Sequence, residues 1–276
     1  MSKSASVIPI HPPRFGFAKE AVASWNQFCD SDLYFVFSDE KDAEEFKKIC
    51  FGNYKSIILP ENLRSYRNPI SVKKYYGVMQ LIKEFKYVGV FDAEIKVVKP
   101  FDTDTIYEEI WNTQQLKCNQ CFPDVNGGNV VYNNSVTMGL DKNEKLLEQT
   151  DHFKWYWWFN EICVYESKAS KLFFDYLENH PQKDILFHEY WCFDYLIFGI
   201  WLICHQDFKC VKFFPDRKFG FGAIEHNQFN IGGVTEKFNS YMDSNMHPEN
   251  YEKIKVQFHM DRYVPESQRH LVRVDA

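Results

Sequence analysis

The chain has 276 residues, 45% of them hydrophobic and 18% aromatic, so it can bury a sizeable core and is neither disordered nor fibrous. Its formal net charge of −6 argues against nucleic acid as the main partner, because contacts to a phosphate backbone need clustered lysines and arginines. The most apolar stretch, residues 190–204, is too short for a membrane span and contains Asp194.

The start of the chain and its cysteines predict a soluble, cytoplasmic protein. Residues 1–7 are largely polar and residues 8–15 contain three prolines, which does not resemble a secretion signal. Eight cysteines are scattered along the chain, many inside apolar runs where a reduced thiol behaves as a small hydrophobic side chain. A single CxxC at 118–121 has no second pair at zinc-ribbon spacing and favours neither a metal nor a redox role.

The first hundred residues alternate between two patterns. Short runs of β-branched and aromatic residues predict strands, and apolar residues spaced by three and four predict helices between them. Strands are expected at 7–10, 33–37, 56–59 and 87–91, and helices at about 18–28, 43–49 and 72–82. Ser38 or Asp39 is expected to cap the second helix and Ser71 the third. Three strand–helix units leading into a fourth strand predict a mostly parallel, Rossmann-like sheet over about residues 5–100.

Beyond residue 100 the pattern becomes mixed. Helices are expected near 103–112, from Ser167 onwards and at 188–204, the last nearly apolar all round and therefore buried. Strands are expected at 130–132 and 161–165, and the tail after Gly220 is expected to form loops and short strands over the cleft. No G-x-G-x-x-G or G-x-x-x-x-G-K motif occurs, which argues against dinucleotide oxidoreductases and P-loop enzymes.

The fourth predicted strand ends in two carboxylates one residue apart, Asp92 and Glu94. Ligands of open α/β sheets bind beyond the carboxyl ends of the strands. Two acids at that place can hold a hard divalent cation that bridges phosphate oxygens. An acid-x-acid after an apolar run also occurs as an ordinary solvated turn, so both interpretations stay open at this point.

A glycine-poor Rossmann-like half, the acids at 92 and 94 and an aromatic second half together resemble the nucleotide-sugar glycosyltransferases of the GT-A fold. Asp92-Ala93-Glu94 stands where that family has its Asp-x-Asp motif. The resemblance implies one GT-A-like α/β domain over residues 1–276, with a nucleotide-binding half at about 5–100 and an acceptor-binding half at about 101–276. In length and general character the chain also resembles glycosyltransferases that large algal viruses encode for capsid glycans.

The resemblance also implies a donor site. Asp92 and Glu94 would hold Mn²⁺ or Mg²⁺ against the diphosphate of the donor, and Ala93 between them would lie against the donor. Glu94 is longer than the family's second acid, and the same fold also transfers sugars without a metal. The other residues it implicates are His11 and Asp39 for the nucleotide base, Arg14, Arg67 and Lys73 for the phosphates, and His226 and His259 as further metal ligands. From the residues alone, Asp39 equally suits a helix cap, His11 a packed loop and Lys73 a solvated helix face.

Five successive aromatic residues, at 155–159, cannot all face one core in either a helix or a strand. Aromatic rings beside an amide and a carboxylate suit the apolar faces and polar rims of sugars. We therefore expect an acceptor platform that includes Trp155, Trp157, Trp158 and Glu161. The alternative is a lid packed on the sheet.

Two acids flank the start of the apolar helix expected at 188–204. On one helix Glu189 and Asp194 would lie about 140° apart, so both cannot face the same site. Glu189 would lie in the first turn, where the helix dipole favours its charge, and is the preferred catalytic base. Asp194 is the second candidate and would need a hydrogen-bonding partner if buried, and Glu161 is a third.

Together these features predict a glycosyltransferase that moves a hexosyl or pentosyl group from a UDP-linked donor to a glycan acceptor, with inversion. Two alternatives stay open. A nucleotidyltransferase that makes sugar nucleotides would share the Rossmann-like half but normally carries a glycine-rich loop after its first strand. A non-catalytic carbohydrate-binding protein on a transferase-like fold would keep the aromatic block and show no turnover.

Overall fold

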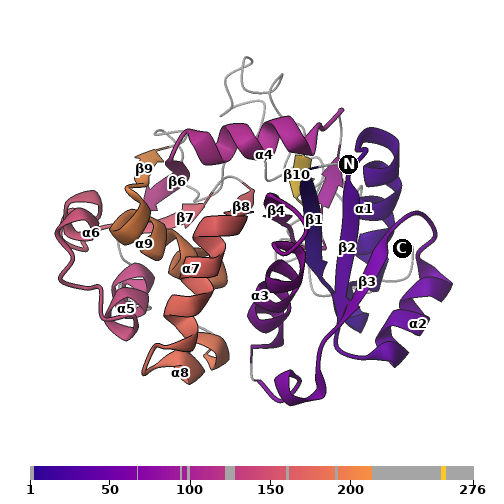
Figure 1. Cartoon of the computed structure of the whole chain (residues 1–276), viewed down its shortest axis with the longest axis horizontal. Coiled ribbons are helices and arrows are strands. Elements are labelled where there is room, and N and C mark those ends of the chain that lie inside the picture. The colour runs from indigo at the N-terminus through magenta and orange to yellow at the C-terminus, as the bar shows by residue number, and fades with distance from the viewer. Residues whose placement is uncertain are drawn as a thin grey trace, which may run out of the picture.

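The computed structural model describes residues 3–66, 68–93, 95–97, 100–121, 128–159, 162–189, 192–212 and 256–258. Within them, the central five-stranded sheet has the order β3-β2-β1-β4-β8 (Figure 1). The first four strands are parallel, and β8 pairs with β4 in the antiparallel direction. Their bounds are β1 Ser4–Pro9, β2 Asp32–Phe37, β3 Lys55–Ile58, β4 Tyr87–Val90 and β8 Cys163–Glu166. The predicted class, an α/β protein with a mostly parallel sheet, is confirmed.

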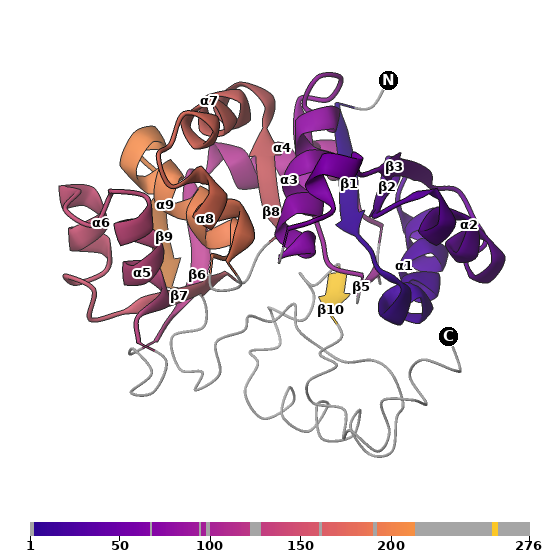
Figure 2. The ribbon, with the colours of Figure 1, turned by 90° about the horizontal axis from the view of Figure 1, so that it is seen from below.

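Helices connect and cover these strands. Their bounds are α1 Phe15–Phe28, α2 Glu40–Ile49, α3 Pro69–Leu81, α4 Thr103–Asn112, α5 Val130–Thr137, α6 Glu144–Gln149, α7 Ser167–Glu178, α8 Lys183–His188 and α9 Asp194–Gln206, with 3₁₀ turns η1 Pro12–Arg14 and η2 Glu61–Leu63. In both views α1 and α2 lie towards the β3 edge of the sheet and α5 to α9 lie beyond β8 (Figures 1 and 2).

Two small sheets complete the described part. One has the order β7-β6-β9, formed by β6 Gln115–Cys121, β7 Tyr156–Phe159 and β9 Lys209–Lys212. The other pairs β5 Ile95–Val97 with β10 Val256–Phe258. The sheet of β5 and β10 therefore links the segment after β4 to a strand more than a hundred residues later in the chain.

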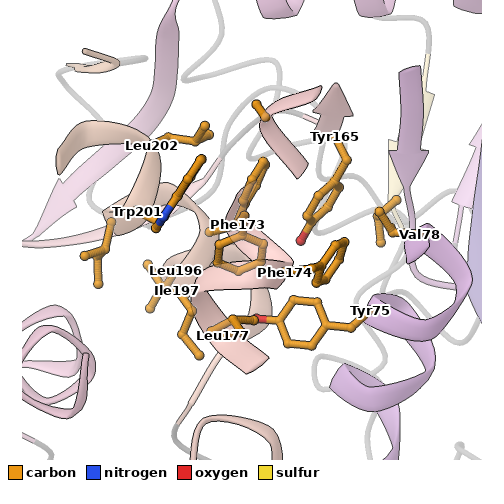
Figure 3. Close-up of a cluster of buried hydrophobic side chains, with 14 of the residues drawn as sticks. Tyr75, Val78, Tyr165, Phe173, Phe174, Leu177, Leu196, Ile197, Trp201 and Leu202 are labelled. Atoms are coloured by element: carbon orange, nitrogen blue, oxygen red, sulfur yellow. The ribbon is translucent and has the colours of Figure 1, made fainter. Parts of the chain in front are cut away.

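Alternate side chains of β1 enter two different cores, as expected for a strand covered on both faces. Ala5 and Val7 belong to the core shared with α3, α7 and α9, whereas Ile8 belongs to the core shared with α1, α2 and α4. The first of these cores is rich in aromatic rings from α3, α7 and α9 (Figure 3). In it Tyr165 stacks on Phe198 with ring centroids 4.1 Å apart.

One of the two predicted helix caps is observed in the structure. Asp39 caps α2, and its carboxylate accepts a hydrogen bond from the Asp42 amide at 2.9 Å, as expected for one of the two predicted residues. The predicted cap of α3 is wrong. Asn68 caps that helix and Ser71 lies inside it, because Pro69 fits the first helical position and starts the helix earlier.

Two further predictions are corrected. Residues 130–132 form the start of α5 and not a strand, because Asn129 caps them and accepts from the Tyr132 amide at 3.1 Å. The helix expected at 188–204 begins only at Asp194, and the segment before it follows the end of α8. A nearly uniform apolar run has no periodicity to mark such a break, whereas Asp194 is a residue favoured in a first turn.

Gly77 lets α3 approach the sheet closely. A Cβ at this position would lie 2.7 Å from a Val7 methyl and 2.8 Å from a Val36 methyl, both in the core. We expect Gly77→Ala to lower the free energy of unfolding by about 1–2 kcal/mol, because overpacking outweighs the better helix propensity of alanine. Urea unfolding measures the change, with Gln80→Ala on the same helix as the control. A Gly77→Ala protein as stable as the wild type would show that the helix shifts without cost.

Candidate active site

The strand order reverses between β1 and β4. From β1 the chain proceeds to β2 and β3 on one side, and β4 then pairs with the other side of β1. His11 lies two residues beyond the end of β1 and Asp92 two residues beyond the end of β4. The carboxyl ends of strands at such a reversal are where open α/β sheets bind ligands. His11 and Asp92 therefore flank the position that the topology favours for a site.

A buried lysine joins Asp92 to a second acid. The Lys74 ammonium, on α3, lies 3.0 Å from Asp92 Oδ1 and 3.6 Å from Asp194 Oδ1. The Lys74 and Asp194 side chains are only 11% and 6% exposed, whereas that of Asp92 is 56% exposed. One ammonium thus connects an open carboxylate at the end of β4 with a buried carboxylate at the start of α9.

The charges of this group depend on one another. Burial by itself lowers the pKa of Lys74. The nearby carboxylates of Asp194 and Asp92 raise the pKa by more than burial lowers it, so the net shift is upward and the ammonium stays charged. Burial raises the pKa of Asp194, and Lys74 opposes that shift. Removing Lys74 would leave the Asp194 carboxylate uncompensated in the interior, whereas removing Asp194 would leave Lys74 with the half-exposed Asp92 as its partner.

Asp194 has the hydrogen-bonding partner that the sequence required of it. The Ser71 hydroxyl donates to Asp194 Oδ1 at 3.3 Å, and the Tyr75 hydroxyl donates to the Asp194 backbone carbonyl at 3.2 Å. The first residue of α9 is therefore held by three residues of α3: Ser71, Lys74 and Tyr75. With 4% of its surface exposed, Asp194 is held inside the protein and is poorly placed to meet an acceptor hydroxyl.

The position expected for Glu189 is corrected. It follows the last residue of α8 in extended backbone and precedes α9, so it does not lie in the first turn of the apolar helix. A dipole effect on Glu189 and an angle of about 140° to Asp194 both require one continuous helix, so neither applies here. Glu189 is half-buried, and its backbone carbonyl accepts from the Cys192 amide at 3.0 Å.

Two predicted donor-site residues, Lys73 and His11, lie near the end of β1. Lys73 is 1% exposed and its ammonium donates to the Ile10 carbonyl at 2.5 Å, so the expected solvated helix face is wrong for this residue. Burial lowers the pKa of Lys73 to about 8, against the opposing effect of Asp42 and Asp39. His11 is half-buried, and its Nδ1 is buried without a hydrogen-bond partner among the described residues.

The remaining predicted donor residues have separate surroundings. The Arg14 guanidinium carbon lies 5.5 Å from the centroid of the Phe17 ring. One carboxylate oxygen of Asp39 caps α2, which is the structural role that the sequence suggested for this residue. Ala93 is 3% exposed and packs in the core with α1 and α2.

His11 should make stability depend on pH. Burial, followed by Lys73 and Arg14, lowers the pKa of His11 from 6.5 to about 4. Between these two values the unfolded chain binds a proton that the folded protein does not, so stability falls as pH falls from 6.5 to 4. We expect His11→Asn to flatten this part of the profile of unfolding free energy against pH. The exposed His152→Asn is the control, and equal profiles for both variants would contradict the assignment.

The aromatic block is partly structural. Trp157, on β7, is 0% exposed, and its Nε1 has no hydrogen-bond partner among the described residues. The packing alternative therefore holds for Trp157, because a side chain without exposed surface offers no face to a sugar. Trp155 is half-buried just before the strand and stays a candidate for acceptor binding.

Several predicted site residues lie outside the described part of the chain: Arg67, Glu94, Glu161, His226, His259 and the side chain of Trp158. Within the described part, no group of three or more His, Cys, Asp or Glu side chains is placed to hold a metal. Mg²⁺ is commonly bound through one or two carboxylates and the phosphates of a substrate, and Mn²⁺ prefers the same oxygen ligands. The half-exposed Asp92 fits such a cation as one ligand.

Lys74 was not among the residues expected at the site. A signal was present, since Lys74 stands four residues before Val78 and three after Ser71, on a side of the predicted helix that carries buried residues. A lysine at such a position needs a buried counter-charge.

No helix in the described residues combines the length and the apolar character needed to cross a membrane.

No protein-family model matches the chain, and no curated protein sequence matches it either. Solved structures similar to it include core-mannan synthase A (CmsA/Ktr4) from Aspergillus fumigatus in an Mn/GDP form, with a TM-score of 0.45 and 10% identity over 77% of this chain and 73% of that chain. Another is the mannosyltransferase Ktr4p from S. cerevisiae, with a TM-score of 0.43 and 9% identity over 66% of this chain and 62% of that one. A likeness at this level assigns no activity, so the function has to be argued from the site.

Proposed function

We propose that the chain is a glycosyltransferase that moves a sugar from a nucleoside diphosphate sugar to a glycan acceptor. The observation that supports this most is the half-exposed carboxylate of Asp92 beyond the end of β4, beside the reversal of strand order at β1. An acid at that position is suited to hold a metal-bound diphosphate.

In this proposal the donor lies across the carboxyl ends of β1 and β4. Asp92 would hold a Mn²⁺ or Mg²⁺ ion, which would supply positive charge to the diphosphate leaving group. His11, kept neutral by its lowered pKa, lies beside the position proposed for the nucleotide base, and Asp39 lies at the start of α2. Lys73 fixes the segment after β1 through the Ile10 carbonyl, and Arg14 remains the candidate for a phosphate contact.

The donor nucleotide is proposed to be UDP and the transfer to proceed with inversion. A single displacement needs a carboxylate within hydrogen-bond reach of the attacking hydroxyl, on the side away from the diphosphate. Asp194 is committed to Lys74 and Ser71, so Glu189 is the proposed base among the described residues. Trp155 is proposed to contact the acceptor.

A panel of UDP-linked and GDP-linked sugars tests the function, with nucleotide release measured with and without Mn²⁺ and with and without glycan acceptors. Release that rises when an acceptor is present supports a transferase. Formation of a nucleoside triphosphate from pyrophosphate and the sugar nucleotide would instead identify a nucleotidyltransferase. Binding of glycans with no release from any donor would identify a carbohydrate-binding protein.

A further inference from the structure

We propose that the Lys74 ammonium is an internal counter-ion that competes with a divalent cation for Asp92. This inference rests on the proposed function only in that Asp92 is taken as the residue that contacts the metal. In this view the site is partly charge-compensated before a metal binds, and the cation has to displace an ammonium to reach the carboxylate. Asp194 then serves as the second partner that receives the displaced ammonium.

The distances support an exchange between two partners. Lys74 lies closer to the open carboxylate, at 3.0 Å from Asp92 Oδ1, than to the buried one, at 3.6 Å from Asp194 Oδ1. Its side chain is 11% exposed and emerges from α3, so the ammonium has little room to leave for water. A small movement from one carboxylate towards the other is therefore the accessible motion, and Asp194 is held for it by Ser71.

The contact between Lys74 and Asp92 decides the direction of the effect. Asp92, Lys74 and Asp194 together carry a net charge of −1, the same as Asp92 alone, so the difference comes from the ammonium 3.0 Å from Asp92 Oδ1. A divalent cation at Asp92 meets the fixed positive charge of Lys74 within a few ångströms, which weakens its binding. If Asp194 is made neutral, Lys74 has only Asp92 as a charged partner and should compete more strongly.

Binding of Mn²⁺ alone, followed through the paramagnetic resonance signal of the free ion, tests the proposal without any turnover. We expect Lys74→Met/Asp194→Asn to bind Mn²⁺ at least about tenfold more tightly than the wild type, since it removes the competing charge together with its buried partner. We expect Asp194→Asn alone to bind Mn²⁺ more weakly than the wild type. Asp92→Asn sets the background from other sites.

Equal Mn²⁺ affinity in the wild type and the double variant would overturn the proposal, as would tighter binding that persists when Asp92→Asn is added. Circular dichroism and urea unfolding check that each variant is folded, and Lys74→Gln/Asp194→Asn replaces the double variant if that protein does not fold. Sugar transfer by the wild type with unchanged Mn²⁺ affinity in the double variant would overturn this inference alone. Tighter Mn²⁺ binding without transfer from any donor would overturn the proposed function alone.

Discussion

Replacing Lys74 with methionine should lower the free energy of unfolding by about 3–5 kcal/mol, the usual result of removing one partner of a buried ion pair. Methionine keeps most of the volume of the lysine stem but leaves the Asp194 carboxylate buried without its counter-ion. Ser71 would still donate to that carboxylate, which is too little to compensate a buried charge. Urea or thermal unfolding at neutral pH measures the loss.

The matched control is Lys74→Met/Asp194→Asn, which removes both charges. Buried ion pairs replaced as a unit often cost little stability, so the double variant should recover most of what Lys74→Met loses. With Asp194→Asn as the fourth protein, the double-mutant cycle gives the coupling energy between the two side chains. A Lys74→Met protein as stable as the wild type would mean that Asp194 is not buried in solution as the structure places it.

Asp92→Asn should lower kcat/KM for the nucleotide-sugar donor by at least about tenfold, which corresponds to roughly 1.4 kcal/mol of transition-state stabilisation. Asparagine keeps the shape of the side chain but loses the charge that holds a divalent cation against the diphosphate. The protein should stay folded, because Asp92 is 56% exposed and Lys74 keeps Asp194 as a partner.

Asp175→Asn provides the control for that experiment, since it makes the same chemical change at an exposed position on α7. Steady-state kinetics of both variants, at saturating acceptor and varied donor, separate a local effect from a general loss of charge. Wild-type kinetics in a folded Asp92→Asn protein would remove Asp92 from the donor site.

The sheet was predictable because its signals are local. Each of the strands β1 to β3 contains a short apolar run and is followed by a helix pattern, and β4 contains a fourth such run. Right-handed crossovers then make these four strands parallel. The expected range of α4 agrees with the observed Thr103–Asn112. The direction of β8, which runs antiparallel to β4, depends on pairing between residues more than seventy positions apart and has no local signal.

The site was less predictable, because its side chains meet across long separations in the sequence. The position of Asp92 followed from the strand before it, but its connection to Asp194 runs through Lys74 and joins three separate elements. The position expected for Glu189, in the first turn of the apolar helix, was wrong because a uniform apolar stretch hides the break between α8 and α9. The ring of Trp157 was expected to be exposed. It is buried instead, on β7, which pairs with β6 in the small three-stranded sheet.

The proposed donor site lies across the carboxyl ends of β1 and β4. Crystals of the protein can be soaked with UDP and Mn²⁺, and in parallel with GDP and Mn²⁺. We expect electron density for a diphosphate whose cation is coordinated by Asp92 and whose base lies beside His11. Nucleotide density at another place in the fold, with Asp92 still paired only to Lys74, would rule out this donor site.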